Sequence, residues 1–331
     1  MSDLYKSEQV EKKIWAGVDI GGTKTAVALC SEAPEVLARV EFPTLPTLGP
    51  DRALNLIKQT IHELIDANGI HHDQLESIGV SCGGPLDRAS GIIQAPPNLA
   101  TWVDVPITSI LQAEFGVPCR LENDANAGAV AEHRFGAGKG TEHMVFLTMG
   151  TGMGAGIIAN GRLYHGATDL AGEIGHVRLT SSGPVGHNKA GSVEGWVSGG
   201  GLAEVATNEV VSAIKNGEST ALIAKYRSGP LTAKDVALAA QEGDELSKQI
   251  MHDTGVRLGR ALAIVIDVLN PQRIVIGGLA MRLGETLLDP ARSEVCKEAL
   301  SASVNNCEIV PSALGEQIGD IAAFCVARGF V

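Results

Sequence analysis

The sequence lacks the usual marks of a membrane or secreted protein. No run reaches the ~18 uninterrupted apolar residues that a membrane-spanning helix needs. Residues 1–13 are polar and charged, without the apolar core of a secretory signal. The six cysteines are scattered with no C-x-x-C pair, which is typical of reduced proteins rather than of disulfide frameworks or zinc ribbons. We therefore expect a cytoplasmic location.

Basic residues are scarce relative to acidic ones. There are 26 Lys and Arg against 38 Asp and Glu, a net charge of −12, which argues against nucleic acid or an anionic membrane as a partner. The 14 prolines are not an excess and the glycines follow no period, so collagen-like and linker structures are excluded. With 44% hydrophobic residues, the 331 residues correspond to about two folded domains at ~100–200 residues each.

Glycine is the abundant residue, with 40 of 331 against an average near ~7%. An excess of this kind in a folded protein indicates tight turns or close backbone approaches to a ligand. Two segments repeat a pattern of strand, glycine turn and strand: VDIGGTKTAVAL (18–29) and LTMGTGMGAGII (147–158). This weak repeat predicts two similar halves, divided near Glu122.

The apolar patterns predict an α/β layered domain followed by a second α/β half. In the first half we expect strands over Ile14–Ile20, Thr25–Cys30, Val36–Phe42, Ser77–Ser81 and Cys119–Glu122, and helices after a cap at Asp51, over Pro106–Glu114 and over Ala125–Phe135. In the second half we expect strands over Met144–Met149, Gly156–Ala159, His176–Leu179 and Ile274–Ile276, and helices over Leu202–Asn216, Glu245–Leu269 and Ile318–Phe330.

The first glycine turn has the composition of an anion cradle. Backbone N–H groups at Gly21 and Gly22 can approach a phosphate, and Thr23 and Lys24 add a hydroxyl and a positive charge. Asp19 ends the preceding strand and suits a water-mediated contact with phosphate-bound Mg²⁺. From these residues alone, an ordinary β-hairpin turn explains the segment equally well.

The second glycine turn contains Gly150, Thr151 and Gly152 and partly fits a dinucleotide-binding fingerprint. That fingerprint requires a following helix, whereas residues 157–164 contain Asn160-Gly161 and predict a hairpin. No phosphate loop of the G-x-x-x-x-G-K-[ST] type occurs in the chain. Two glycine hairpins in two similar halves instead predict a nucleotide held between domains.

Six short motifs, in order, resemble those of the ROK family of repressors and sugar kinases. They are DIGGTKT (19–25), PNLATW (97–102), ENDANA (122–127), TMGTGMGAG (148–156), AGEIGH (171–176) and VIGGLA (275–280). The resemblance implies an actin/hexokinase-like (ribonuclease H-like) α/β fold of two domains with a cleft between them. It places the N-terminal domain at 1–121, joined by the C-terminal helix at about 313–331, and the second domain at 122–312.

The resemblance also implies the roles of individual residues. Asp124 matches the base that takes the proton from the sugar hydroxyl as it attacks the γ-phosphorus of ATP, although Asn123 or Asp124 could simply cap the following helix. Gly277 and Gly278 match an adenosine contact, and ATP with Mg²⁺ is the implied cosubstrate. The positions that match sugar contacts are Gly83, Gly84, Asn98, Asn123, Glu173, His176 and Glu194.

One motif departs from the family pattern. Many members carry three zinc-binding cysteines after the signature histidine, and the corresponding positions here are Val185, His187 and Ser192. Valine cannot ligate zinc and serine is a poor ligand, so we expect no zinc. The same loop shapes the sugar pocket, which weakens any assignment of the substrate by analogy.

The resemblance favours ATP- and Mg²⁺-dependent phosphorylation of a hexose, with glucose as the default substrate. Fructose, mannose, allose, N-acetylmannosamine and N-acetylglucosamine stay open, as does polyphosphate as the donor. The alternatives are a sugar-responsive transcriptional regulator and a non-catalytic sugar-binding protein. Only 13 residues precede the first strand, and we expect no DNA-binding segment and no nucleic-acid or membrane partner. Relatives are often dimers or tetramers, so a homo-oligomer is expected.

Overall fold

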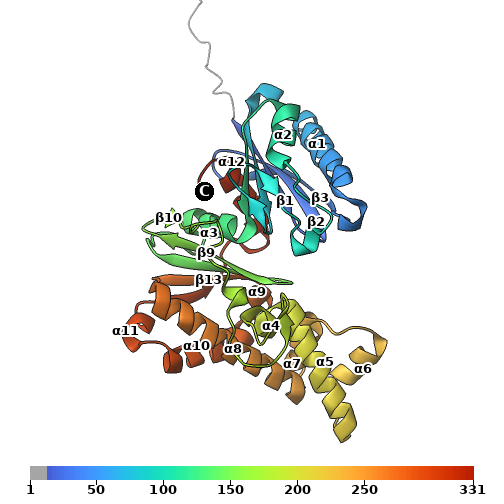
Figure 1. The fold of residues 1–331 in the computed structure, drawn as a ribbon, viewed down its shortest axis with the longest axis vertical. Coiled ribbons are helices and arrows are strands. Elements are labelled where there is room, and N and C mark those ends of the chain that lie inside the picture. Colours follow the sequence, from blue (N-terminus) through green and yellow to red (C-terminus); the bar gives the residue numbers. More distant parts are fainter. Residues whose placement is uncertain (1–12) are drawn as a thin grey trace, which may run out of the picture. The chain divides into compact units, whose positions relative to one another are not determined.

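A computed structural model describes residues 13–331, and the chain divides into two compact units (Figure 1). Unit 1 comprises the described residues up to 127 and the C-terminal segment Gln317–Val331, and unit 2 comprises Gly128–Glu316. These limits lie a few residues beyond the sequence-based boundaries at 121/122 and about 312/313. The sequence analysis expects no secretory signal within residues 1–13. Residues 1–12 lie outside the part of the chain that the structure describes.

Unit 1 is a five-stranded sheet in the order β3-β2-β1-β4-β7 with helices on both faces. Strands β1, β4 and β7 are parallel, and β2 and β3 extend the sheet as antiparallel hairpins. Its elements are β1 (Ile14–Ile20), β2 (Lys24–Cys30), β3 (Val36–Pro43), α1 (Pro50–Ala67), β4 (Leu75–Cys82), β5 (Leu86–Asp87), β6 (Ile92–Ile93), α2 (Ile107–Phe115), β7 (Cys119–Asn123) and α12 (Ile318–Ala327). Helix α3 (Asp124–Phe135) begins in unit 1 and continues into unit 2.

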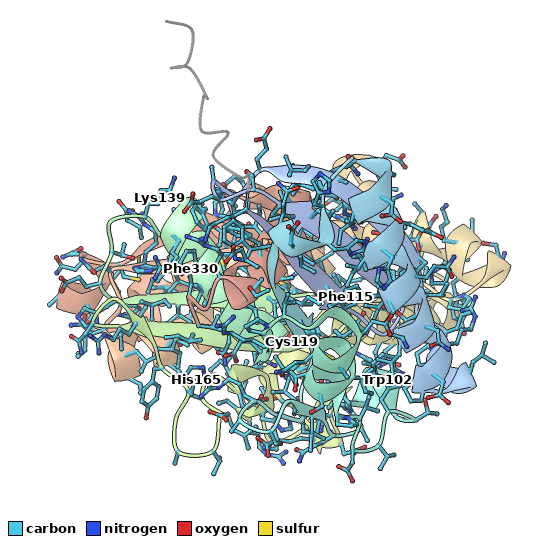
Figure 2. All side chains as sticks on the ribbon, turned by 90° about the horizontal axis from the view of Figure 1, so that it is seen from above. Trp102, Phe115, Cys119, Lys139, His165 and Phe330 are labelled. Carbon is cyan, nitrogen blue, oxygen red and sulfur yellow. The ribbon has the colours of Figure 1, made fainter. Side chains whose placement is uncertain are left out.

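Alternate residues of β1 face two different helical layers. Ile14, Ala16, Val18 and Ile20 join the core under α1 and α2, which also contains Trp102, a fully buried residue labelled in Figure 2. Glycines 17 and 79 lie on the opposite face, where α12 packs. A Cβ at Gly79 would overlap the backbone of Ala323 and Ala327, so this glycine allows the C-terminal helix to lie directly on the sheet.

Unit 2 contains a second five-stranded sheet, in the order β10-β9-β8-β13-β14. Its strands are β8 (Met144–Met149), β9 (Met153–Ala159), β10 (Arg162–Leu163), β13 (Arg273–Gly278) and β14 (Glu308–Pro311), with a separate hairpin of β11 (Val185–Gly186) and β12 (Lys189–Ala190). Its helices are α4 (Val193–Val197), α5 (Gly199–Asn216), α6 (Leu222–Ser228), α7 (Ala233–Gln241), α8 (Glu245–Leu269), α9 (Leu279–Leu283), α10 (Glu285–Glu298) and α11 (Ser301–Val304).

The two sheets have the same local plan. In each, the first strand pairs antiparallel with the next strand through a glycine turn and parallel with a later strand on its other side. The repeat of strand, glycine turn and strand in the sequence thus marks the equivalent part of both sheets. Helix α8 lies close to α10, because Gly255 and Gly259 leave room for Pro290 and Ala291.

Three local predictions were wrong. Helix α1 begins at Pro50 after Gly49, so Asp51 lies in its first turn and is not the cap. Strand β9 begins at Met153, which shortens the second glycine turn to 150–152. The expected strand at 176–179 is absent from the described structure: a 3-10 helix covers Ile174–His176, and only Arg178 forms an isolated bridge. Among residues 13–331, no helix is long and apolar enough to cross a membrane.

Candidate active site

In unit 1, the predicted residues meet where parallel strands end. Asp19 lies opposite Ser81 near the carboxyl ends of β1 and β4, and Asn123 ends the neighbouring strand β7 opposite Cys82. Ligands of open α/β sheets bind outside this edge of the strands. Topology therefore explains why segments around 19, 83 and 123, far apart in the sequence, contribute to one site.

The first glycine turn is held by the chain around it. The N–H of Gly21 donates to the carbonyl of Lys24 at 2.9 Å, which closes the hairpin turn. The buried hydroxyl of Thr44 donates to the carbonyl of Gly21 at 2.7 Å, and the N–H of Thr44 donates to the carbonyl of Thr23 at 3.1 Å. Thr44 is a supporting residue that sequence reasoning missed, because nothing in its local sequence indicates that it packs against residues 21–23.

The ammonium group of Lys24, which follows this turn, is already paired with a carboxylate. Its Nζ forms a 2.9 Å ion pair with Glu41, on the neighbouring strand β3. Gly22, in contrast, packs directly against the predicted sugar loop, since a Cβ at this position would lie 2.6 Å from the Cβ of Asn98. The turn and the sugar loop therefore form one surface within unit 1, and Asn98 is exposed on it.

Of the neighbouring residues Asn123 and Asp124, Asn123 is the one that caps the helix. The Oδ1 of Asn123 accepts hydrogen bonds from the N–H groups of Ala125 at 3.0 Å and Asn126 at 3.3 Å, so Asn123 caps α3. Its Nδ2 points to the Gly83–Gly84 loop, at 3.6 Å from the place of a Cβ on Gly84. Asp124 is the first helical residue and is exposed, with Oδ1 accepting from the N–H of Ala125 at 2.8 Å.

A buried carboxylate fixes this corner from behind. Oε1 of Glu122 accepts from the N–H of Asn123 and from Nδ2 of Asn126, both at 3.0 Å. Its other oxygen, Oε2, lies 3.7 Å from Nε of Arg88, in the segment that follows the Gly83–Gly84 loop. Glu122 thus connects that loop to the start of α3, a role that its place in the sequence motif did not reveal.

Asp19 and Asp124 form an acidic pair. Burial, the negative charge of Asp124 and the charge of Asp320 together raise the pKa of Asp19 to about 6, against the opposing effects of a hydrogen bond with Ser81 and the charge of Lys24. Partial loss of hydration also raises the pKa of Asp124, while hydrogen bonds from the backbone N–H groups of Ala125 and Asp124 lower it.

The acidic pair fits a phosphate-bound Mg²⁺. Carboxylate oxygens with a neighbouring hydroxyl are ligands that this cation prefers, and its charge would relieve the repulsion that raises the pKa of Asp19. Within 13–331, no group of three or more His, Cys, Asp or Glu is arranged to hold a metal ion on its own. Such a cation would therefore depend on phosphate and water for the rest of its ligands.

In unit 2, Glu194 lies against the second glycine turn. Its Oε2 accepts from the N–H of Met153 at 3.1 Å and would lie 2.7 Å from a Cβ on Gly152. A Cβ on Gly175 would lie 3.5 Å from the Cβ of Glu194. The turn, the signature segment 171–176 and Glu194 are therefore close together.

The start of α5 is a further part of this turn that was missed. The side chain of Ser198 caps the helix, and the N–H of Gly199 donates to the carbonyl of Gly150 at 2.8 Å. A helix N-terminus favours an anion, and here it adjoins the turn expected to bind phosphate. Ser198 was the available signal, since serine is a preferred residue at the N-terminal cap of a helix.

The two glycines at the end of β13 differ. Gly278 is exposed next to the end of β8, and its φ of 69° is one that favours glycine. Gly277 is buried, with its Cβ position 3.0 Å from the ring of Phe146, so packing explains this residue without a ligand. Of the remaining predicted residues, Glu173 and Thr151 are exposed and His176 is partly buried.

Comparison with known proteins agrees with these motifs. The model of the ROK family matches residues 15–329. A glucokinase of Halalkalibacterium halodurans is 34% identical over 93% of this chain and 92% of its own length. The crystal structure of a ROK family glucokinase from Streptomyces griseus in complex with glucose and AMPPNP is 28% identical with a TM-score of 0.78, covering 96% of this chain and 99% of that chain.

A regulator shares the fold as well. The crystal structure of a ROK family transcriptional regulator, a homologue of the E. coli MLC protein, covers 96% of this chain and 78% of its own, with a TM-score of 0.84 and 23% identity. The α/β fold expected from the resemblance is confirmed, with hexokinase-like sugar kinases among its structural neighbours. The match over nearly all of the described residues establishes that the chain belongs to the ROK family.

Proposed function

We propose that this protein transfers the γ-phosphoryl group of ATP to a hydroxyl of a hexose, with Asp124 as the general base. Sugar kinases are among its most similar relatives, and the observation that carries the proposal is the division of roles between neighbouring residues. Asn123 caps the helix, which frees Asp124 from that task and leaves its carboxylate exposed at the carboxyl edge of the sheet.

Each residue has a defined task in the proposed reaction. The bond from Ala125 N–H fixes Oδ1 of Asp124, so Oδ2 can take the proton of the attacking sugar hydroxyl. The Nδ2 group of Asn123 and the exposed Asn98 bind sugar hydroxyls. Glu173, His176 and Glu194 are assigned the same role. The Gly83–Gly84 loop contacts the sugar at its edge.

Phosphate binding is assigned to the two glycine turns. Backbone N–H groups at 21–23 and 150–152 donate to phosphate oxygens, helped by the N-terminus of α5, and Gly278 contacts the adenosine. Asp19 holds Mg²⁺ through water, and the cation, when bound, neutralises charge on the transferring phosphoryl group. Glucose is the default substrate. All six cysteines are free, and we propose a reducing, cytoplasmic location for the protein. We also propose that it forms a homo-oligomer, as the family resemblance implies.

The decisive experiment measures sugar phosphate formed from glucose, fructose, mannose, allose, N-acetylglucosamine and N-acetylmannosamine, with ATP or polyphosphate as donor. Asp124→Asn should lower kcat by about 10²–10⁴, the range for loss of a general base, and leave sugar binding near normal. Asp51→Asn, on the exposed first turn of α1, is the matched control and should keep full activity.

Two outcomes would contradict the proposal. Turnover of Asp124→Asn above a tenth of the wild-type rate would assign the base elsewhere. Sugar binding without turnover on any sugar or donor would favour the regulator or the non-catalytic binding protein, which share the fold but need no base.

A further inference from the structure

The loop that carries three zinc-binding cysteines in many relatives has Val185, His187 and Ser192 at those positions. Residues 185–190 form a two-stranded hairpin, with Val185 paired to Ala190 and Gly186 paired to Lys189. Its two turn residues, His187 and Asn188, have φ values of 46° and 60°, as the turns of tight hairpins require. The hairpin is therefore a locally defined element rather than an irregular remnant.

Three hydrogen bonds made by side chains connect residues 176–180, at and just after the end of the signature segment, to the hairpin and to α4. The Nζ of Lys189 donates to the backbone carbonyl of His176 at 2.7 Å. Nη1 of Arg178 donates to the carbonyl of Ala190 at 2.6 Å, and Nε1 of Trp196 donates to Oγ1 of Thr180 at 2.7 Å. Backbone bonds from Val193 N–H to Val177 and from Leu179 N–H to Gly191 lie between these points. Residues 176–180 are thus fixed to the segment 189–196 along their length.

Lys189 acts on His176 directly, through its charged ammonium group. A hydrogen bond donated by an ammonium group is about twice as strong as one between neutral groups. The same hairpin places the ring of His187 against the ring of His176, with centroids 4.5 Å apart and an edge-on angle of 63°. The hairpin therefore contacts His176 twice: Lys189 binds its backbone carbonyl, and the ring of His187 packs against its ring.

We propose that Lys189 is a positioning residue for sugar binding: its ammonium group fixes the backbone of His176, and so the imidazole, in the place that a metal would otherwise determine. This inference rests on the proposed function, in which His176 contacts the sugar. Lys189 itself does not touch the nucleotide turn at 150–152, whose neighbour Met153 is bound by Glu194. Loss of the ammonium should therefore weaken sugar binding selectively.

The test compares Lys189→Met with Lys189→Arg and with Lys215→Met. Methionine keeps the unbranched side chain but removes the charge and the donor, whereas arginine keeps both. Lys215 lies exposed on α5 in the same unit and serves as the control for loss of a surface lysine. For each variant, sugar Kd is measured by calorimetry without nucleotide, the KM values for sugar and ATP by steady-state kinetics, and Tm by calorimetric melting.

We expect Lys189→Met to raise the Kd and KM for sugar about 10-fold or more, the factor for one lost charged hydrogen bond, with the KM for ATP within twofold of wild type. Lys189→Arg should return both sugar constants to within about threefold, and Lys215→Met should change neither. A sugar Kd of Lys189→Met within twofold of wild type would overturn the inference, as would equal losses of sugar and ATP affinity.

If Lys189→Met does not fold, Lys189→Gln replaces it, and an unchanged sugar Kd in that variant overturns the inference equally. Failure of the proposed function looks different. There the wild-type protein itself neither binds nor phosphorylates any sugar of the panel. Failure of the inference leaves the wild type fully active, with a Lys189→Met variant that either matches it or loses sugar and ATP affinity equally.

Discussion

The Asp19 carboxylate, which we propose binds Mg-nucleotide, should lower the stability of the folded protein at neutral pH. Its carboxyl has a pKa of about 6 in the folded protein against 3.8 in an unconstrained chain. The folded state therefore holds a proton more tightly than the unfolded state, and ionisation at neutral pH opposes folding. We expect Asp19→Asn to stabilise the protein and to inactivate it. The amide keeps the size of the side chain and can still accept the hydrogen bond from Ser81.

The magnitude follows from the pKa. The difference between 3.8 and about 6 corresponds to about 3 kcal/mol at 1.36 kcal/mol per pKa unit. Asp19 is partly exposed, so solvent screening reduces the expected gain to about 1–2 kcal/mol, or roughly 3–6 °C in Tm for a unit of this size. Stability of the wild type is lost as the pH rises from 4 through 6. The gain of Asp19→Asn should thus be complete at pH 7.5 and disappear near pH 4.

The assay is thermal unfolding of wild type, Asp19→Asn and the control Asp51→Asn at pH 4.5, 6 and 7.5, with kinase activity measured at pH 7.5. We expect kcat/KM for Mg-ATP to fall about 100-fold or more when Asp19 loses its charge. A Tm at pH 7.5 equal to or below that of wild type would refute the reasoning, because the carboxylate would then not be strained by its neighbours. A gain at pH 4.5 as large as that at pH 7.5 would assign the effect to packing, because the electrostatic part should by then have fallen to less than half.

Three further predictions concern stability and metal content. Glu132→Gln should destabilise unit 2 by about 3 kcal/mol, because the buried carboxylate accepts from the N–H groups of Ala137 and Leu314 and from the hydroxyl of Ser312. Chemical denaturation measures this loss. The control Glu298→Gln, at an exposed residue, should change the free energy of unfolding by no more than about 0.5 kcal/mol. Gly79→Ala should destabilise by about 1–3 kcal/mol or more, since the new methyl overlaps the backbone of α12, and an unchanged unfolding midpoint would contradict that packing. Incubation with EDTA followed by excess Mg²⁺ should leave activity unchanged, whereas elemental analysis that finds about one zinc per chain would falsify the metal-free account of the 183–195 loop.

The sequence by itself determined the order of the elements and the position of the turns. Short, nearly continuous apolar runs predicted β1 and β8, as is typical of strands buried on both faces, and both strands have the predicted ends. The repeated glycine turns were equally legible, since few residues can form them. The ends of elements were predicted less well where a turn, a strand and a short helix are all compatible with the local sequence. At 150–156 the strand begins earlier than predicted, and at 176–179 a predicted strand is replaced by the end of a 3-10 helix and an isolated bridge.

Only the tertiary structure decided which partner each polar side chain takes. Lys24 pairs with Glu41, Asn123 gives its oxygen to α3, and Lys189 reaches the carbonyl of His176. No local pattern encodes these choices, because each depends on a segment brought close by the packing of the sheets or hairpin. The loop without cysteines shows the limit most clearly. The sequence excluded thiolate ligands there, but what replaces them is a set of hydrogen bonds between residues 176–180 and 189–196, whose geometry exists only once both segments are folded.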